Sequence, residues 1–308
     1  MAASEMKLLY LIALVLSLMA QPLHADNWQQ AVQKQIAAIE RAVAPYRDIR
    51  QARADGWRRT TAHVPLMGEH WARRDGVDYV VGDALDLHRQ SNLIYAEIGG
   101  RMELIAVSYV VRIGPNDPMP RGFSGPADVW HVHNLDQILA ALGEKRPLIA
   151  RLGSRWVARN FAQDGNRRLA MVHVWLYGNN PAGVFENLNP TLPYRRLGLG
   201  PAYSDGASLD AAQGIALAHP NGCDNELDGK LWLAAVTGQK KRALGRICRQ
   251  MQAQVRASLD RPPAELNRVA AEAWRVFDEQ RFMLLSDDER RRMLSIVEGA
   301  GGTCAVVQ

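Results

Sequence analysis

The chain has 308 residues, of which 47% are hydrophobic and 22% are charged; these are the values of a globular protein, not of a disordered one. Its formal net charge of +5 is mild, and the basic residues are spread along the chain. Because no stretch interleaves aromatic and basic residues as a nucleic-acid groove does, we expect no nucleic-acid partner.

The first 25 residues have the pattern of a secretory signal peptide. A short polar start with Lys7 precedes an apolar run over residues 8–20, and small residues lead to Ala25. This run is too short to span a bilayer comfortably, so we predict cleavage after Ala25, with an uncleaved anchor as the alternative. The mature chain is expected to be periplasmic or secreted, with no stable membrane span.

An amphipathic helix is expected next, because apolar residues recur every three or four positions from Trp28 to Val43. Between residues 64 and 193 the pattern changes to short apolar or alternating runs separated by Gly, Pro, Asn and Asp. Strands are predicted at residues 79–81, 92–98, 102–113, 129–133 and 168–177. Gly99-Gly100 predicts a tight hairpin between two of them, so we expect a mostly antiparallel sheet.

From residue 208 onward the sequence is typical of helices. Apolar residues recur at helical spacing in several segments, and Ser286 with Glu289 forms a capping box before the last one. The predicted fold class is α+β, with a mostly antiparallel central sheet, a flanking N-terminal helix and a C-terminal helical subdomain. The predicted divisions are a signal peptide at 1–25, a β-rich domain at 26–203 and the helical subdomain at 204–308.

The three cysteines are Cys223, Cys248 and Cys304. An odd number allows at most one intramolecular disulfide, and an exported chain meets a compartment that permits one. We predict a bridge between Cys223 and Cys248, with Cys304 left over. None of the three has the C-x-x-C spacing of a zinc ribbon or of a thioredoxin-type site.

Histidines on two predicted strands are the first candidates for chemistry. His131 and His133 form an H-x-H pair, and side chains two apart on a strand project from the same face. The second strand contains Met171-Val172-His173-Val174-Trp175. Alternation places Met171 and Trp175 on the face of His173, which suits the wall of a pocket. Considered alone, His173 is also compatible with a core histidine that is hydrogen-bonded to backbone.

A third segment, Met67-Gly68-Glu69-His70-Trp71, is predicted to be a turn in which Gly68 permits an unusual backbone angle and aims His70. Imidazoles from all three segments would suit a transition metal, and thioether sulfur favours copper slightly over zinc. A glutamate ligand beside the histidines would instead suggest iron or manganese. The candidate ligands are His70, His131, His133 and His173, with Met67, Met171, Glu69 and Glu97 as additional candidates.

Three functions are compatible with these residues. The first is a secreted metal-binding protein for storage, sensing or transfer. The second is a metal-dependent oxidoreductase that uses iron or copper on the same ligands. The third is a structural or interaction protein whose histidines are core residues. Nucleophile-elbow, phosphate-loop, dinucleotide-binding and H-E-x-x-H motifs are all absent from the sequence, so no catalytic residue is assigned.

The run GNNPAGVFENLNP at residues 178–190 is expected to be a loop that covers the His173 strand. Its asparagines are expected to close turns, and Phe185 is expected to attach the loop to the core.

The segments PLMGEHW, GFSGPADVWHVH and MVHVWLYGNNPAGVFENLNP resemble a group of secreted bacterial proteins of unassigned function. The resemblance spans residues 46–190. It implies that His70, His131, His133 and His173 belong to a recurring layout, and it implies no reaction.

Overall fold

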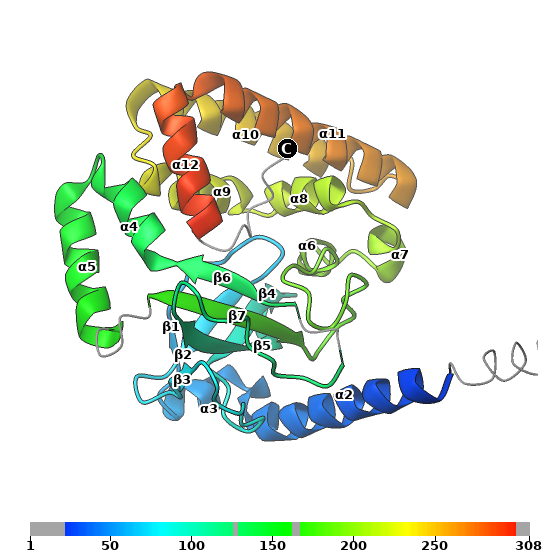
Figure 1. Ribbon diagram of the computed structural model, residues 1–308. Helices are drawn as coiled ribbons and strands as arrows, with labels where there is room; N and C mark the ends of the chain where they lie inside the picture. Colours follow the sequence, from blue (N-terminus) through cyan, green and yellow to red (C-terminus); the bar gives the residue numbers. More distant parts are fainter. Residues whose placement is uncertain (1–21, 126–128, 162–166, 300–308) are drawn as a thin grey trace, which may run out of the picture.

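The structure is a computed structural model that describes residues 22–125, 129–161 and 167–299. These residues form a seven-stranded sheet with helices at both ends of the chain, which confirms the predicted α+β class. Figure 1 shows the sheet in the middle, with the N-terminal helices on one side and the C-terminal helices on the other. Residues 1–21 of the predicted signal peptide lie outside the described residues.

The N-terminal part consists of α2 (Pro22–Val43), a 3-10 turn η1 (Ala44–Arg47) and α3 (Ile49–Ala54). Val32, Ile36, Ile39 and Val43 are buried along one side of α2, as their three- and four-residue spacing predicted. They share a hydrophobic cluster with one face of the sheet. This helix therefore covers the face of the sheet that carries no histidine ligand candidate.

The strands follow the order β1-β2-β4-β5-β7-β6, and β3 pairs with β5 outside this path. All pairs are antiparallel except β3 with β5. Gly99 and Gly100 have φ values of 57° and 75°, so the predicted hairpin between β4 and β5 is confirmed. The strands are β1 (Arg58–Arg59), β2 (Glu69–Ala72), β3 (Tyr79–Val80), β4 (Asn92–Ile98), β5 (Arg101–Ile113), β6 (His131–Asn134) and β7 (Arg168–Trp175).

The two faces of the sheet have different partners. Val172 and Val174 are fully buried against the N-terminal helices, together with Val107 on β5. His173 lies between the two valines and points to the opposite face, as the alternation of the strand predicted. The face that carries His173 is turned toward the C-terminal helices (Figure 1).

Helices make up most of the remaining described chain. Ser286 accepts from the backbone N–H of Glu289, whose carboxylate accepts from the N–H of Ser286, so the predicted capping box is confirmed. The helices are α4 (Leu135–Gly143), α5 (Pro147–Phe161), α6 (Leu192–Arg196), α7 (Pro201–Ser204), α8 (Leu209–Ala218), α9 (Gly222–Leu233), α10 (Gly238–Arg256), α11 (Pro263–Leu284) and α12 (Asp287–Gly299).

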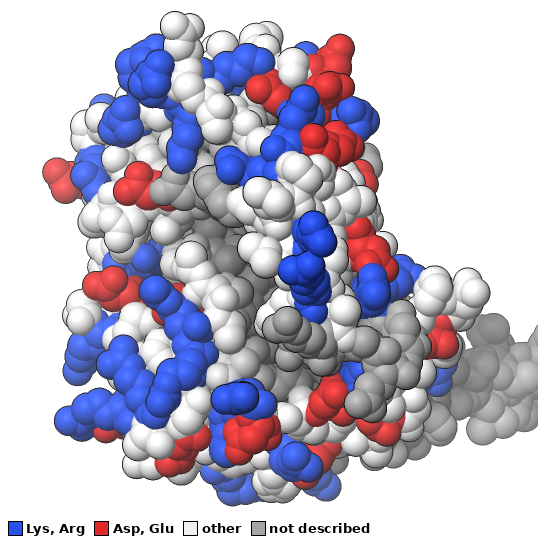
Figure 2. Space-filling model, turned by 90° about the vertical axis from the view of Figure 1, so that its left-hand side faces the viewer, with Lys and Arg blue, Asp and Glu red and all other residues white. Residues whose placement is uncertain are grey.

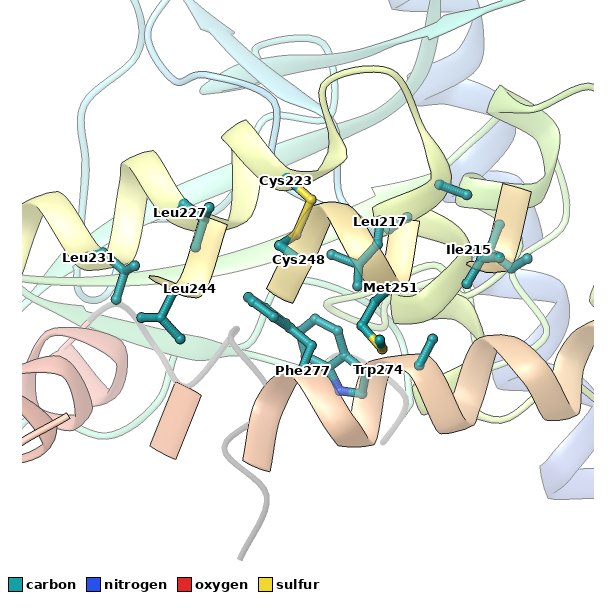
Figure 3. Packing of buried hydrophobic residues seen from close by; sticks show 14 of the residues in the cluster. Ile215, Leu217, Cys223, Leu227, Leu231, Leu244, Cys248, Met251, Trp274 and Phe277 are labelled. Carbon is teal, nitrogen blue, oxygen red and sulfur yellow. A yellow bond between two sulfur atoms is a disulfide. The ribbon is translucent and has the colours of Figure 1, made fainter. Parts of the chain in front are cut away.

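A second hydrophobic core lies among the C-terminal helices. Figure 3 shows Met251 of α10 beside Trp274 and Phe277 of α11, near the bridge between Cys223 and Cys248. The Cα atoms of the bridge lie 5.8 Å apart, and the predicted disulfide is confirmed. Closing a loop of this size adds about 3 kcal/mol to the free energy of unfolding. Cys304 lies outside the described residues.

A search of the described helices for a stretch long and apolar enough to cross a membrane found none.

Candidate functional site

Three strands bring the four predicted histidines to one face of the sheet. His70 lies on β2, which was predicted as a turn; the turn ends at Gly68, and Glu69–Ala72 pairs with β4. His131 and His133 lie on β6, which pairs with β7, the strand of His173. Ala106 and Ser108 occupy this face of the intervening β5, where Ser108 is the register partner of His173. Their small side chains leave space in which the imidazoles meet.

The four imidazole rings form a continuous row. The Nε2 atoms of His70 and His173 lie 3.3 Å apart, and the centres of the two rings are 5.4 Å apart. The ring of His131 lies 5.1 Å from that of His173 and 4.9 Å from that of His133. His70, His131 and His173 expose 6%, 9% and 0% of their surface, and His133 is partly buried. Residues 103 positions apart in the sequence are therefore direct neighbours.

Hydrogen bonds fix two of the rings. Nδ1 of His173 lies 3.0 Å from the backbone carbonyl oxygen of Asn187. A carbonyl oxygen only accepts, so His173 carries its proton on Nδ1 and directs the Nε2 lone pair toward His70. Thr61 holds His70: its hydroxyl oxygen accepts from the backbone N–H of His70 at 2.9 Å and lies 3.4 Å from Nδ1.

The rings of His131 and His133 differ from the other two in having ring nitrogens without hydrogen bonds to the described residues. Among the described residues, neither ring nitrogen of His131 has a hydrogen-bond partner, and Nε2 of His133 has none either. A buried polar group without a partner forfeits its hydration, and most such groups in native proteins are paired. These three nitrogens are therefore available to a group that binds among the rings.

Burial keeps all four histidines neutral at physiological pH. Desolvation lowers the pKa of His70 to about 3, with a smaller contribution from His173, and lowers that of His131 to about 2. Burial likewise lowers the pKa of His133 and of His173 to about 4. Neutral imidazole is the form that carries a lone pair for a metal ion.

The structure places some of the additional candidate ligands on the face of the histidines and others away from it. Met171 is the register partner of His131 and lies on the same face as His173. Met67 is buried in the turn before β2. Glu69 points to the other side of β2, where it accepts from the indole of Trp71 and lies 3.6 Å from a guanidinium nitrogen of Arg59.

Glu97, also a candidate ligand, is exposed near the end of β4. Burial lowers the pKa of Arg196 to about 10, and the charge of Glu97 partly opposes that shift, so Glu97 faces Arg196. The structure thus places Met171 beside the imidazoles, and it turns both carboxylates elsewhere.

Two of the four imidazoles already have the spacing of metal ligands, and the other two do not. No group of three or more His, Cys, Asp or Glu side chains is placed to hold a metal ion as it stands in residues 22–125, 129–161 and 167–299. The pair His70 and His173 does have a suitable spacing, because two nitrogens bound tetrahedrally at about 2.0–2.1 Å lie roughly 3.3 Å apart. A third nitrogen requires the ring of His131 or His133 to turn. For His131 that rotation breaks no hydrogen bond within the described residues, since neither of its ring nitrogens makes one.

The loop after β7 covers His173. The indole N–H of Trp175 donates to the carbonyl of Glu186 at 2.6 Å. Phe185 is buried, and the centre of its ring lies 4.5 Å from that of Phe123. Asn180 and Asn189 bind backbone groups of the same loop, so their turn-closing role and the attachment through Phe185 are as predicted. The carbonyl of Asn187 had no signal in the sequence, because any residue type supplies one.

A second polar cluster lies apart from the row of rings. Nη1 of Arg196 donates to Nε2 of His63 at 2.7 Å, and Nη2 lies 3.0 Å from Nε2 of His219. Burial, and then the charge of Arg196, lowers the pKa of His63 to about 3 and that of His219 to about 4. His63 therefore belongs to this cluster. The cluster links the segment before β2 to α6 and to the C-terminal end of α8.

Comparisons with family models, with curated proteins and with solved structures found no match. The residues of the chain and their geometry are therefore the whole basis for a functional conclusion.

Proposed function

We propose that this protein binds one transition-metal ion through the imidazoles of β2, β6 and β7, with copper slightly preferred over zinc. The observation that carries the proposal is the row of four rings from distant segments, whose inner nitrogens include three with no hydrogen-bond partner in the described chain. The role that follows from such a site in an exported protein is storage, sensing or transfer of the metal.

The alternative of four ordinary core histidines accounts poorly for His131. A structural histidine gains stability by bonding both ring nitrogens, as His173 does with Asn187 and His70. His131 is 9% exposed, and neither of its ring nitrogens has a hydrogen-bond partner in the part of the chain that the structure describes. Leaving such a ring buried costs about 1–3 kcal/mol, which a bound metal ion would offset.

Each ring would have a definite part in holding the ion. His70 and His173 would supply the first two nitrogens, because their Nε2 atoms already have ligand spacing. The carbonyl of Asn187 would keep the His173 proton on Nδ1, an arrangement that commonly orients metal-binding histidines. His131 or His133 would supply a further nitrogen after turning.

Copper and a binding role are favoured by separate observations. The thioether of Met171 lies on the same face, opposite His131, and soft sulfur favours Cu(I). The burial of His70, His131 and His173 favours a closed site, whereas a catalytic metal keeps a position open to substrate. An oxidoreductase on these ligands remains the second candidate, and ligand count separates the two.

The decisive experiment is elemental analysis of the chain purified from the periplasm, followed by titration with Cu(I) and Zn(II). We expect about one ion per chain, and loss of binding in the His131→Ala/His133→Ala double variant. His88→Ala is the matched control, since His88 is exposed on a loop. Circular dichroism would verify that each variant folds. A folded wild-type chain that takes up neither metal would overturn the proposal, as would a double variant that binds like wild type.

A further inference from the structure

We infer that the outer face of α5 is a docking surface for an anionic lipid bilayer. This inference is independent of the metal site. It concerns a helix that the sequence analysis did not anticipate and that no part of the proposed function uses. The surface, called the α5 face below, consists of Leu148, Leu152 and Trp156 with the basic residues Lys145, Arg151 and Arg155.

The apolar part of the α5 face is a stripe along the helix. Leu148, Leu152 and Trp156 follow one another at intervals of four residues, so they lie on one side of the helix. Their exposed fractions are 74%, 63% and 57%. Large side chains with such exposure are costly in water when they are grouped, and grouped apolar side chains mark interaction surfaces.

The opposite side of α5 is already used for packing. Val157 and Ala150 are buried, exposing 3% and 8%. A side chain at Gly153 would approach Leu139 of α4 to 2.7 Å, so this glycine allows the two helices to pack closely. The apolar stripe is therefore additional to the residues that hold α5 in the fold. Figure 1 shows α5 as the outermost element at the left of the molecule.

Positive charge accompanies the stripe. Arg151 and Arg155 are exposed and immediately precede Leu152 and Trp156 in the sequence, and Lys145 is exposed before the first turn. Helix α5 contains no Asp or Glu. The nearest acidic residue before it, Glu144, lies 3.0 Å from Arg291, which offsets its charge. Figure 2 shows many basic side chains on this side of the molecule, with acidic ones among them.

An anionic bilayer matches both features at once. Helices that lie in the membrane interface insert leucine and tryptophan at the boundary of the acyl chains and keep arginine or lysine at the phosphates. Basic residues beside the surface add electrostatic attraction to acidic headgroups. The long stems of arginine also allow the charge to stay at the headgroups while the stripe inserts. The exposed position of α5 leaves its outer side accessible to an extended flat surface.

Vesicle co-sedimentation of the full mature chain tests the inference. We expect binding to vesicles of phosphatidylcholine with about one third phosphatidylglycerol, and weak binding to phosphatidylcholine alone. Leu152→Asp should weaken partitioning on the order of tenfold. The matched control is Leu209→Asp, which changes another exposed leucine, 41% exposed at the start of α8. Arg151→Gln/Arg155→Gln should weaken binding to the acidic vesicles by a similar factor and reduce its dependence on salt.

Three outcomes would overturn the inference. The first is an absence of binding to acidic vesicles by the folded wild-type chain. The second is equal binding by Leu152→Asp and wild type. The third is a protein partner that requires Leu152 while vesicles do not bind. Unchanged metal content in all the α5 variants keeps this test separate from that of the metal site.

Discussion

The Nε2 atoms of His70 and His173 lie 3.3 Å apart, and the proton that can lie between them belongs to His70. His173 keeps its own proton on Nδ1, because that nitrogen lies 3.0 Å from the carbonyl oxygen of Asn187. If a metal ion takes the place between the rings, His70 has to carry its proton on Nδ1 instead. The hydroxyl oxygen of Thr61, 3.4 Å from Nδ1, is then the acceptor.

Thr61→Val should therefore weaken metal binding while leaving the fold intact. It removes the oxygen that would accept from Nδ1 of metal-bound His70 and that also accepts from the backbone N–H of His70. Loss of such an outer partner typically costs about 10–100-fold in metal affinity. Competition titration against a chelator measures the change. Thr60→Val is the control, because the Thr60 hydroxyl donates to the backbone carbonyl of His70 instead of contacting its ring. Equal affinities for both variants would contradict this tautomer assignment.

Met171→Leu should discriminate between the two candidate metals. Leucine has nearly the volume of methionine and no sulfur, so the substitution removes a soft donor with little change in packing. We expect about a tenfold loss of Cu(I) affinity with Zn(II) affinity nearly unchanged. Met251→Leu, at a buried methionine of the core among the C-terminal helices, should alter neither affinity. Parallel losses for both metals in Met171→Leu would show that its effect is one of packing.

His131→Leu should stabilise the metal-free protein by about 1 kcal/mol or leave it unchanged. The substitution removes two buried nitrogens that have no partner among residues 22–125, 129–161 and 167–299, so it removes a desolvation cost without breaking a bond there. His173→Leu should do the reverse and cost about 1–3 kcal/mol, because the carbonyl of Asn187 loses its donor. Urea denaturation measures both free energies of unfolding. A strongly destabilised His131→Leu would mean that this imidazole has a structural partner after all.

Gly68→Ala should destabilise the protein by about 2 kcal/mol or more. Its φ of 101° is unfavourable for alanine, and the added Cβ would lie 2.5 Å from the backbone carbonyl oxygen of Tyr95. Gly56→Ala is a matched control with a φ of 90° and no atom within 4 Å of the new Cβ, so it should cost only about 1 kcal/mol. Thermal unfolding of the two variants isolates the effect of the steric contact. The contact also shifts the turn that leads to His70, so metal affinity should fall in the first variant alone.

The histidines of the second cluster predict acid sensitivity. The pKa of His63 is lowered from 6.5 to about 3, by burial first and by Arg196 second. The unfolded chain therefore binds a proton at His63 below pH 6.5 while the folded chain stays neutral there, so stability falls as the pH decreases from 6.5 toward 3. The loss is at most about 1.4 kcal/mol per pH unit for this residue.

His63→Gln should remove the part of that dependence that His63 contributes, while His219 and the four histidines of the row keep theirs. Glutamine cannot titrate in this range, and its amide oxygen can accept from Nη1 of Arg196 as Nε2 of His63 does. Urea denaturation at several pH values between 4 and 7 provides the slope. His88→Gln, on an exposed loop, should keep the wild-type slope. A His63→Gln slope that is indistinguishable from wild type would remove His63 as a source of the acid sensitivity.

Local sequence patterns were sufficient to predict much of the sheet, one helix cap and the disulfide. The strand at 92–98 was predicted with the bounds observed for β4, because apolar runs between turn residues are strong local signals. The capping box at Ser286 and the bridge between Cys223 and Cys248 followed from short-range chemistry. Helix α5 was missed although Leu148, Leu152 and Trp156 recur there at four-residue spacing, which is a helical signal; only the tertiary structure shows that this stripe faces solvent. Strand β2 is only four residues long, and its pairing with β4 is a long-range contact that no local pattern encodes.

By itself the sequence determined which side chains share a face, since alternation along a strand is a property of the extended backbone. It therefore placed His131 with His133, and His173 opposite its flanking valines. Only the tertiary structure decided that His70 meets His173, because that contact depends on the register of four strands and on the small side chains of Ala106 and Ser108 between them. It also decided which nitrogens find partners, as hydrogen bonds to a distant backbone carbonyl such as that of Asn187 arise only once the loop has packed over the strand.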